Sequence, residues 1–592
     1  MKITPNTSTL GNLFNIANEQ FYIPAYQRRY AWGKPQLDAL FNDINQLGEN
    51  DSHLLGTILF LTESHIGGIN RLEVVDGQQR ITTISIILKV ILDKFIKEGS
   101  DQMAEIKKYL SCKTSGNTKN KIELGDLDEP DYKKIIDGSE LDKIENKNLK
   151  EAYYYFKEKI DGLGKDISDF YDKLVNRVEV IRLDMAEAKD AYKLFETINN
   201  RGLRLSTTDI VKNFLLGHAS LIGEKTLNLV KNHWKNMIVN LNIIDSDKFF
   251  RHFMMKKLRR KIAASKLAEE FKNYYYANIV EAEQLPDFTT HFPLQANNIQ
   301  NDDMEEDESN KNDDLEIESY KDKKVGIIEF AKILEKSSQI YAKIVNQKFT
   351  NYKINRYLSD LKMIESTPTY TFLLDLFERE KLTDGEKIRI LKLLATFMIR
   401  RHICQSRTSE HDDIFSKLVE VDNKNIVENV RKQLSKNLPS DRNFTEQFEK
   451  AQFKGLEERA KYILGKIEFK DQGEVDISKE VELEHIIPQT INTKKSIREF
   501  GNWVKYLGKG SLEKHKDYVW RIGNLTILGE KLNIVASNNP FQSKIKEYKK
   551  SDFKINQIIA SYKKFKFGEV EKRSKELAKK AVKIWNFRNY QD

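Results

Sequence analysis

Cysteine, proline and long apolar runs are scarce in this sequence. Its two cysteines, Cys112 and Cys404, supply neither a disulfide framework nor a thiolate zinc site, so we expect reduced thiols in a cytoplasmic protein. The polar N-terminus lacks the apolar segment of a signal peptide, and no apolar run approaches the length of a membrane span. These absences argue against the secreted and membrane classes, and they predict that no membrane is a partner.

What remains is typical of a large, mainly helical protein. The chain has 592 residues, of which 40% are hydrophobic and 32% charged, with 27 Gly and only 10 Pro. This length exceeds one hydrophobic core, so we expect a multidomain α+β protein. The spacing of apolar residues predicts an α/β domain at 1–215, a helical domain at 216–470, and a third domain at 471–592 with two strands, a Lys-rich insert and terminal helices. An acidic run near 301–318 is expected to form a flexible loop. Three apolar runs predict strands in the first domain: Gly56–Leu61, Leu72–Val75 and Val178–Leu183.

The positive charge of the chain is concentrated at its end. Residues 541–592 hold 13 Lys and 2 Arg against 6 Asp or Glu, an excess as large as the formal charge of +9 of the whole chain. Such a block favours a polyanion partner such as DNA, bound through phosphate contacts and counterion release. Taken alone, a Lys-rich stretch is better explained as the solvated face of a helix, and the neighbouring motif at 484–489 shifts the interpretation toward DNA.

Aromatic and cationic side chains crowd the segment Phe21–Trp32, just before a helix that is expected to begin at Lys34 and Pro35. Aromatic faces and guanidinium groups suit a base or a nucleotide through stacking and bidentate phosphate contact. The alternative is that these aromatics only pack at the edge of the domain. Five residues are therefore predicted to sense or contact nucleic acid: Tyr26, Gln27, Arg28, Tyr30 and Trp32.

A second motif, Asp76-Gly77-Gln78-Gln79-Arg80, follows an apolar strand and precedes an apolar helix. A helix N-terminus offers free N–H groups and a positive dipole to an anion, while the glycine allows close approach of the main chain. Arg80 can bind phosphate oxygens with both arms of its guanidinium group. The motif therefore predicts an anion site.

A third segment, 195–213, contains a helix end, a turn and the capping box Ser206 with Asp209. Capping does not account for Asn199 and Arg201 at the turn, or for Lys212 on the same helix face as Asp209. We predict that they complete a phosphate or nucleic-acid pocket together with the arginine of the second motif.

Near the C-terminus, Glu484-His485-Ile-Ile-Pro-Gln is followed by Gly-Asn524 at the head of a second apolar strand, and by Asn533. Phosphodiester hydrolysis needs a water deprotonated near neutral pH and a metal that neutralises charge. His485 suits the base, Glu484 and Asn533 suit the metal as oxygen ligands, and Asn524 would hold the intervening loop or orient His485. Lys544 is predicted to contact the scissile phosphate. A single His-Ile-Ile-Pro, taken alone, is also typical of a buried strand end.

Four segments together resemble the GmrSD family of type IV restriction endonucleases, including modification-dependent relatives of the SspE type. They are Ile-Pro-x-Tyr-Gln-Arg-x-Tyr-x-Trp from residue 23, Asp-Gly-Gln-Gln-Arg from 76, Phe-Glu-x-Ile-Asn-x-Arg-Gly from 195, and Glu-His-Ile-x-Pro-Gln from 484. The resemblance covers nearly the whole chain. It implies an N-terminal domain like ParB and sulfiredoxin, and a C-terminal ββα-metal nuclease of the HNH type.

The resemblance also implies roles for individual residues. Asp76, Gly77, Gln78, Gln79 and Arg80 would bind a nucleoside triphosphate, with the last three facing its phosphates. The run lacks the Gly-Lys-Ser/Thr of a P-loop, so triphosphate hydrolysis is implied by the resemblance alone. In the nuclease domain, the matching catalytic positions are these: His485, Asn524 and Asn533, with the metal at Glu484 and Asn533.

The leading hypothesis is therefore an anti-phage defence endonuclease, whose HNH domain uses Mg²⁺ or Mn²⁺ to cut double-stranded, modified phage DNA. Its N-terminal domain would gate cutting by binding or hydrolysing a nucleoside triphosphate, or by sensing the modification, and the chain could act as a homodimer. Two alternatives remain open: a nucleotide-dependent DNA-binding regulator with an inactive HNH fold, and an RNA-targeting toxin that arrests growth.

Overall fold

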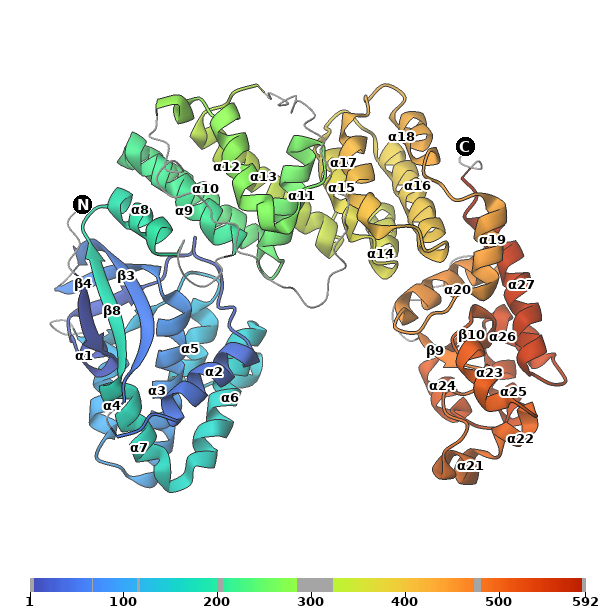
Figure 1. Ribbon diagram of the computed structural model, residues 1–592, viewed down its shortest axis with the longest axis horizontal. Helices are drawn as coiled ribbons and strands as arrows, with labels where there is room; N and C mark the ends of the chain where they lie inside the picture. The colour runs from blue at the N-terminus through green and yellow to red at the C-terminus, as the bar shows by residue number, and fades with distance from the viewer. Residues whose placement is uncertain are drawn as a thin grey trace. The chain divides into compact units, whose positions relative to one another are not determined.

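The computed structural model describes residues 5–49, 51–66, 68–113, 118–199, 206–284, 323–472 and 481–587 (Figure 1). The chain divides into two compact units, described separately below. The first comprises 1–254 with 262–339, and the second 255–261 with 340–592. The division passes through two helices of the middle region, so the predicted domain boundaries at 215 and 470 stay predictions. The predicted acidic loop at 301–318 lies outside the described residues.

A mixed six-stranded sheet forms the centre of the first unit. Its strands run in the order β1-β8-β3-β4-β2-β7, with β3 parallel to β8 and antiparallel to β4. The strand bounds are β1 (Asn6–Thr9), β2 (Glu19–Tyr22), β3 (His53–Ile66), β4 (Ile69–Asp76), β7 (Ile122–Glu123) and β8 (Val178–Met185); β5 (Ser111–Lys113) and β6 (Thr118–Asn120) form a separate hairpin. The three predicted strands are confirmed, since they lie within β3, β4 and β8. Val, Ile, Leu and Phe, which favour buried strands, are frequent in all three.

Helices surround this sheet and continue beyond it (Figure 1). Next to the sheet are α1 (Leu10–Phe14), α2 (Lys34–Asn45), α3 (Gln78–Glu98), α4 (Met103–Tyr109), α5 (Glu129–Asp137), α6 (Lys147–Leu163), α7 (Ile167–Asp172) and α8 (Ala188–Asn199). They are followed by α9 (Thr207–Ile222), α10 (Glu224–Leu241), α11 (Ser246–Leu258), α12 (Leu267–Asn278) and α13 (Ile327–Asn346). The starts of α2 at Lys34, of α3 after Gly77 and of α9 after Ser206 confirm the sequence-based predictions.

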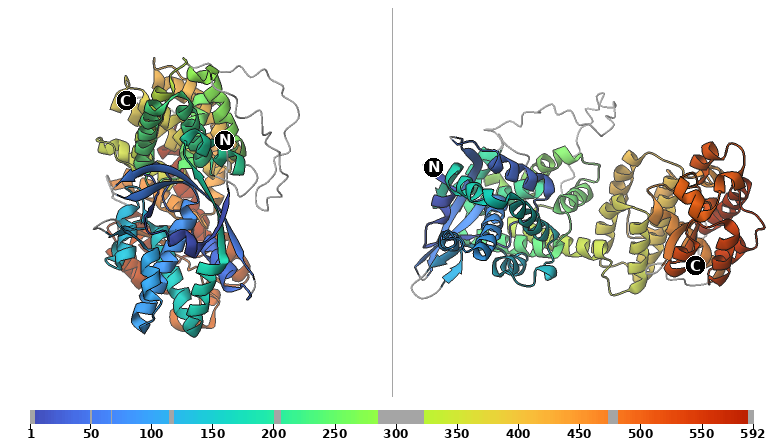
Figure 2. Two further views of the ribbon diagram at one scale, coloured as in Figure 1. Left: turned by 90° about the vertical axis from the view of Figure 1, so that its left-hand side faces the viewer. Right: turned by 90° about the horizontal axis from the view of Figure 1, so that it is seen from below.

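The second unit is mainly helical, with one antiparallel pair of short strands, β9 and β10. Its first helices are α14 (Tyr352–Met363), α15 (Tyr370–Glu378), α16 (Asp384–Ile403), α17 (His411–Lys417), α18 (Ile426–Ser435), α19 (Asp441–Lys450) and α20 (Glu457–Gln472). After β9 (Val481–His485) come α21 (Lys494–Phe500), α22 (Trp503–Leu507), α23 (Ser511–Tyr518), β10 (Leu525–Gly529), α24 (Glu530–Ala536), α25 (Phe541–Lys550), α26 (Lys554–Ala560) and α27 (Phe567–Ile584). Figure 2 shows these last helices, in orange and red, gathered together.

The strand pair of β9 and β10 separates two apolar cores. Leu525 and Ile527 pack in the core of the middle helices, whereas Leu528 packs with Trp503 and Tyr548. Since successive side chains of a strand point to opposite faces, this alternation directs neighbouring residues of β9 to different surroundings. Across the described parts of the chain, no helix has both the length and the apolar character needed to cross a bilayer.

Candidate functional site

A cavity of about 350 Å³ in the first unit collects residues from three sequence motifs. Its walls come from the segment before α2, from the turn between β4 and α3, and from α8 and α9. The lining residues are Gln27, Arg28, Ala31, Trp32, Gln36, Val75, Asp76, Gly77, Gln78, Gln79, Arg80, Phe195, Asp209 and Lys212. The structure therefore brings Lys212 to Arg80, as the sequence predicted, and places Arg28 beside them.

The turn at Gly77 opens the N-terminus of α3 into this cavity. Gly77 has φ +93°, and a Cβ atom there would lie 3.1 Å from Cγ1 of Ile58, so the position requires glycine. No side chain of the described residues caps α3 at Gly77. The first N–H groups and the positive end of this long helix are therefore available to an anion in the cavity.

Arg80 and Asp76 lie on the turn itself. Nη1 of Arg80 donates to the carbonyl of Thr57 at 2.7 Å, and lies 4.0 Å from a carboxylate oxygen of Asp76. Burial raises the pKa of Asp76, and the charge of Arg80 opposes that shift. The strand β3 thus fixes the guanidinium group at the cavity wall, so that it is pre-oriented.

Helix α9 contributes a second cation. Lys212 is buried, and its Nζ contacts the side-chain oxygen of Gln27 and lies 3.7 Å from Asp209. Burial lowers the pKa of Lys212, while Asp209 acts against that shift. Asp209 also accepts from Ser206 Oγ at 2.8 Å and lies 3.3 Å from Nε of Arg28. Its carboxylate therefore ties α9 to the segment before α2.

Gln79 holds that segment rather than facing the cavity with its amide. Its Oε1 accepts from the N–H of Ala31 at 2.8 Å, and its Nε2 donates to the carbonyl of Arg29 at 3.3 Å. The prediction that Gln79 faces a phosphate is therefore replaced by a positioning role. Both polar atoms of the amide are used by the main chain on either side of Tyr30.

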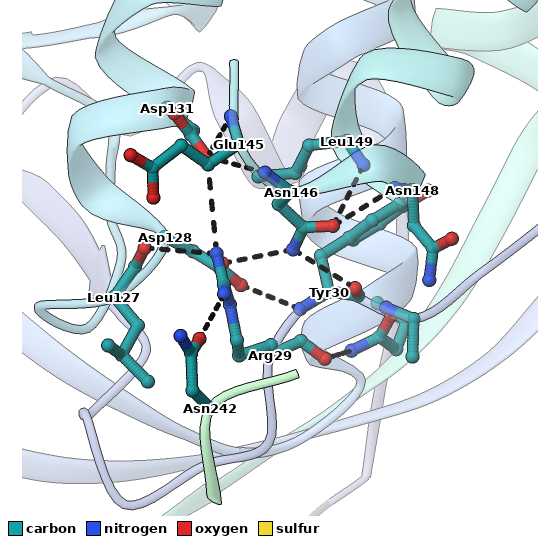
Figure 3. A network of polar contacts seen from close by, with 12 residues as sticks. Arg29, Tyr30, Leu127, Asp128, Asp131, Glu145, Asn146, Asn148, Leu149 and Asn242 are labelled. Carbon is teal, nitrogen blue, oxygen red and sulfur yellow. Dashed lines mark hydrogen bonds and ion pairs between the residues drawn. The ribbon is translucent and has the colours of Figure 1, made fainter. Parts of the chain in front are cut away.

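The network around Arg29 completes this anchoring (Figure 3). Nε of Arg29 donates to Asp128 at 2.6 Å, and Asp128 accepts from the N–H of Tyr30 at 2.7 Å. Asn146 donates to the same carboxylate at 3.0 Å, and Arg29 also reaches Asn242 in the turn after α10. These contacts fix the main chain next to the cavity, and they link the sheet region to the later helices of the same unit.

Two aromatic predictions are wrong, because the side chains are buried. The hydroxyl of Tyr26 is bound by Glu73, and that of Tyr30 lies 2.7 Å from Thr83. Neither ring can stack on a base, so the alternative of edge packing holds for both. Trp32 is half-buried and lines the cavity. Arg201 and the side chain of Asn199 lie outside the described residues, and their predicted roles stay predictions.

In the second unit, β9 pairs with β10, and α24 follows β10 directly. His485 lies opposite Leu525 in the antiparallel register. Asn524 is buried, and its side chain accepts from the N–H of Ile487 at 2.8 Å and donates to the carbonyls of Ile487 and Val519, each at 2.9 Å. Asn524 thus holds the loop after His485, which is one of its two predicted roles.

His485 is buried at the end of β9, against the edge of Trp520, with ring centroids 4.4 Å apart. Its Nδ1 lies 3.3 Å from the side-chain nitrogen of Gln489, and its buried Nε2 has no hydrogen-bond partner among the residues described. Burial, followed by the charges of Lys544 and His515, lowers the pKa of His485 to about 3. The imidazole is therefore neutral at pH 7.

Asn533 lies on α24, the helix that follows β10. Its Oδ1 is buried, and the described part of the chain offers it no hydrogen-bond partner. A buried amide oxygen without a partner is costly in a folded protein. The atom is thus suited to a ligand that the protein itself does not provide.

Glu484 and Lys544 form a buried pair. Nζ of Lys544 lies 2.7 Å from Oε1 of Glu484 and 2.7 Å from the carbonyl of His485, and Tyr548 donates to Oε1 at 3.0 Å. Burial raises the pKa of Glu484 and lowers that of Lys544, and the contact between them opposes both shifts. The prediction that Lys544 contacts the scissile phosphate is wrong, because its ammonium group is fully buried and directed inward.

Comparison with protein-family models finds two matches, which cover both of these regions. Residues 10–216 match the N-terminal domain, and residues 438–580 the C-terminal domain, of the GmrSD restriction endonucleases. The chain belongs to the GmrSD restriction endonuclease family. No curated protein matches it. Membership makes the chain a DNA-cleaving enzyme of a phage-defence family, with DNA as its partner.

The donor atoms of the GmrSD C-terminal domain fit a divalent metal only in part. Asn533 Oδ1 is a suitable buried oxygen, but Oε1 of Glu484 is already bound by two donors. Within the described ranges, no three His, Cys, Asp or Glu side chains come together as a metal-binding group. The ligand role of Glu484 therefore stays a prediction.

Three residues that contact the site in the second unit received no role of their own from the sequence. Tyr548 contacts Glu484, Gln489 contacts His485, and Arg573 of α27 donates to the carbonyls of Ile522, Gly523 and Leu525. Local signals existed for two of them: Tyr548 lies four residues after Lys544 on one helix face, and Gln489 lies four residues after His485 in the same motif. Arg573 lies about fifty residues from its partners, so no local pattern could indicate its contacts.

Proposed function

We propose that the chain is an HNH-type endonuclease, in which His485 activates water against a DNA phosphodiester and the N-terminal cavity regulates cutting through a nucleoside triphosphate. The observation that carries the proposal is the buried, unpartnered Nε2 of His485, within a strand-strand-helix unit that also contains the unpartnered Oδ1 of Asn533. Both atoms are unsatisfied within the described structure, and both suit a reaction centre.

His485 would accept a proton from water at Nε2. Its depressed pKa keeps the ring neutral, so one ring nitrogen carries a lone pair throughout the physiological range, and this nitrogen is Nε2 when Gln489 presents its amide oxygen to Nδ1. Asn524 and the backbone contact from Lys544 hold the main chain on both sides of the ring. Asn533 would hold Mg²⁺ or Mn²⁺ through Oδ1, and the ion, when bound, would neutralise charge on the phosphate and the leaving oxygen.

The cavity in the first unit supports a triphosphate ligand. Its volume of about 350 Å³ falls in the range of small-molecule sites, and Arg28, Arg80 and Lys212 line it beside the N-terminus of α3. Because its wall is anchored to the later helices through Asp209 and Arg29, a bound phosphate would stabilise one arrangement of that segment. Binding or hydrolysis there, or recognition of modified phage DNA by this domain, would license cutting.

Exposed lysines of the C-terminal helices and of the loop before α27 supply a surface for the DNA backbone. They are Lys546, Lys549, Lys550, Lys554, Lys563, Lys564, Lys572, Lys575, Lys579 and Lys583. Phosphate contacts of this kind give affinity without sequence preference, so any selection for modified DNA has to come from elsewhere in the chain.

The test is a cleavage assay on modified and unmodified DNA, with and without Mg²⁺ and a nucleoside triphosphate. We expect cutting only with the metal, and a rate that depends on the triphosphate and on the modification. His485→Ala should abolish cutting while triphosphate turnover continues. Arg80→Ala should weaken triphosphate binding while leaving His485 intact. Equal rates under all conditions would overturn the gating, and cutting by His485→Ala would place the base elsewhere.

A further inference from the structure

The buried cluster of Glu484, Lys544 and Tyr548, called the Glu484 clamp here, lies on the face of β9 opposite to His485. Glu484 is 6% exposed, and both Lys544 and Tyr548 are 0% exposed. One carboxylate oxygen receives both donors, the ammonium at 2.7 Å and the phenol at 3.0 Å. The clamp therefore satisfies this oxygen within the protein.

The clamp is also joined to the main chain of the catalytic residue. The same Nζ of Lys544 donates to the carbonyl of His485 at 2.7 Å. Since Glu484 and His485 are adjacent in a strand, their side chains point to opposite faces, so the clamp acts on His485 through its backbone. The ammonium group of Lys544 thus fixes the main chain at the end of β9, and with it the direction of the His485 ring.

A divalent ion at Oε1 would have to displace both donors. The Lys544 ammonium would then stay fully buried without its carboxylate, which is strongly unfavourable because no water reaches it. Asn533 carries no such obstacle, because its buried Oδ1 has no hydrogen-bond partner in the described residues. The two predicted metal ligands are therefore in opposite situations.

We infer that Glu484, Lys544 and Tyr548 are positioning residues that fix His485, and that Oε1 of Glu484, which both donors hold, is closed to the catalytic metal. The inference rests on the proposed function for the reaction that it serves. It assigns Oε1 to a structural ion pair, and it leaves the amide oxygen of Asn533 open to the ion.

Binding of Mn²⁺ to the intact chain, measured by electron paramagnetic resonance without DNA, separates the two roles. We expect Glu484→Gln to change the dissociation constant by less than about twofold, and Asn533→Ala to weaken binding by about tenfold or more. A tenfold weakening by Glu484→Gln, with Tyr548→Phe unchanged, would overturn the inference. Absence of Mn²⁺ binding by the unaltered chain would contradict the proposed metal dependence instead, and the second measurement then decides on the clamp.

The second measurement is steady-state cleavage together with denaturant unfolding. Tyr548→Phe and Glu484→Gln should lower kcat, by up to about 10- to 100-fold, without changing KM for DNA or the metal concentration that gives half the maximal rate. Glu484→Gln combined with Lys544→Met should unfold at a midpoint no lower than that of the weaker single variant, because each change removes the same pair. Lys505→Met, at an exposed position of α22, is the control. Additive midpoints, or unchanged kcat in folded variants, would overturn the clamp.

Discussion

Gln489 contacts Nδ1 of His485, so the orientation of its amide bears on which ring nitrogen carries the proton. In the orientation of the structure, its side-chain nitrogen lies 3.3 Å from Nδ1, which makes Nδ1 the acceptor and leaves the hydrogen on Nε2. Rotation of the amide by a half turn presents its oxygen instead, and moves the lone pair to Nε2, the atom at which the proposed base would accept a proton. Gln489 is exposed, so this rotation meets little resistance.

We therefore expect Gln489→Leu to lower kcat about tenfold, because the tautomer is no longer selected. Gln489→Glu can only accept at Nδ1, so it should retain cutting within a few-fold of the unaltered chain. Single-turnover cleavage at saturating DNA measures both. Full activity of the leucine variant would show that the tautomer is set by another group.

Gly523, beside Asn524, is a position where a single methyl group is not tolerated. A Cβ atom there would lie 2.1 Å from the carbonyl of Val570 and 2.4 Å from Oγ of Ser574. Gly523→Ala should therefore lower the free energy of unfolding by about 1–3 kcal/mol or more, as expected for overpacking. Gly529→Ala is the matched control, because no described atom lies within 4 Å of its Cβ position. Equal denaturation midpoints for the two variants would contradict the close packing of α27.

Among the elements, α16 and α17 carry two histidines that fold in their neutral form. Burial, together with nearby arginines, lowers the pKa of His402 to about 3 and that of His411 to about 4. The unfolded chain takes up protons below the ordinary value of 6.5, whereas the folded chain does not. The contribution of these histidines to the free energy of unfolding is therefore fully present above pH 6.5, and it is lost as the pH falls toward 4.

The free energy of unfolding of the second unit should consequently fall below pH 6.5, by roughly 1 kcal/mol per pH unit for each histidine. Urea denaturation between pH 7 and pH 5 measures this slope before most carboxylates titrate. His402→Gln combined with His411→Gln should reduce the slope, and the part that remains includes His485 and His515, whose pKa values are also lowered. If the variant keeps the slope of the unaltered chain, other groups cause the acid sensitivity.

At the scale of the whole molecule, capping and turn chemistry could be read from the sequence, and side-chain direction could not. Ser206 with Asp209 and the turn at Gly77 predicted real helix starts, because such signals are local. The direction of Lys544 depends on a carboxylate sixty residues away, and the role of Gln79 on a loop fifty residues before it. A sequence pattern names the residues of a site, but tertiary contacts decide which of them face the ligand.

DNA affinity should depend on salt through the C-terminal lysines. Changing Lys572, Lys575 and Lys579, which are exposed on α27, to Gln should reduce the slope of log affinity against log salt by up to about 3, and weaken modified and unmodified DNA alike. Fluorescence anisotropy with labelled duplexes between 50 and 200 mM salt, roughly the range where the effect is large, measures it. The exposed Lys424, Lys432 and Lys436, changed to Gln, form the control. An unchanged slope would place the DNA on another surface.

Arg573 joins α27, the last described helix, to the turn that carries Asn524. Its guanidinium group donates to three carbonyl groups of that turn and so holds the turn closed. In the sequence, α27 comes after all the other described helices and strands. A chain that stops before α27 contains every described residue of the N-terminal cavity, but it lacks the arginine that holds the turn beside Asn524. We therefore expect a chain truncated before α27 to bind a ligand in that cavity without cleaving DNA.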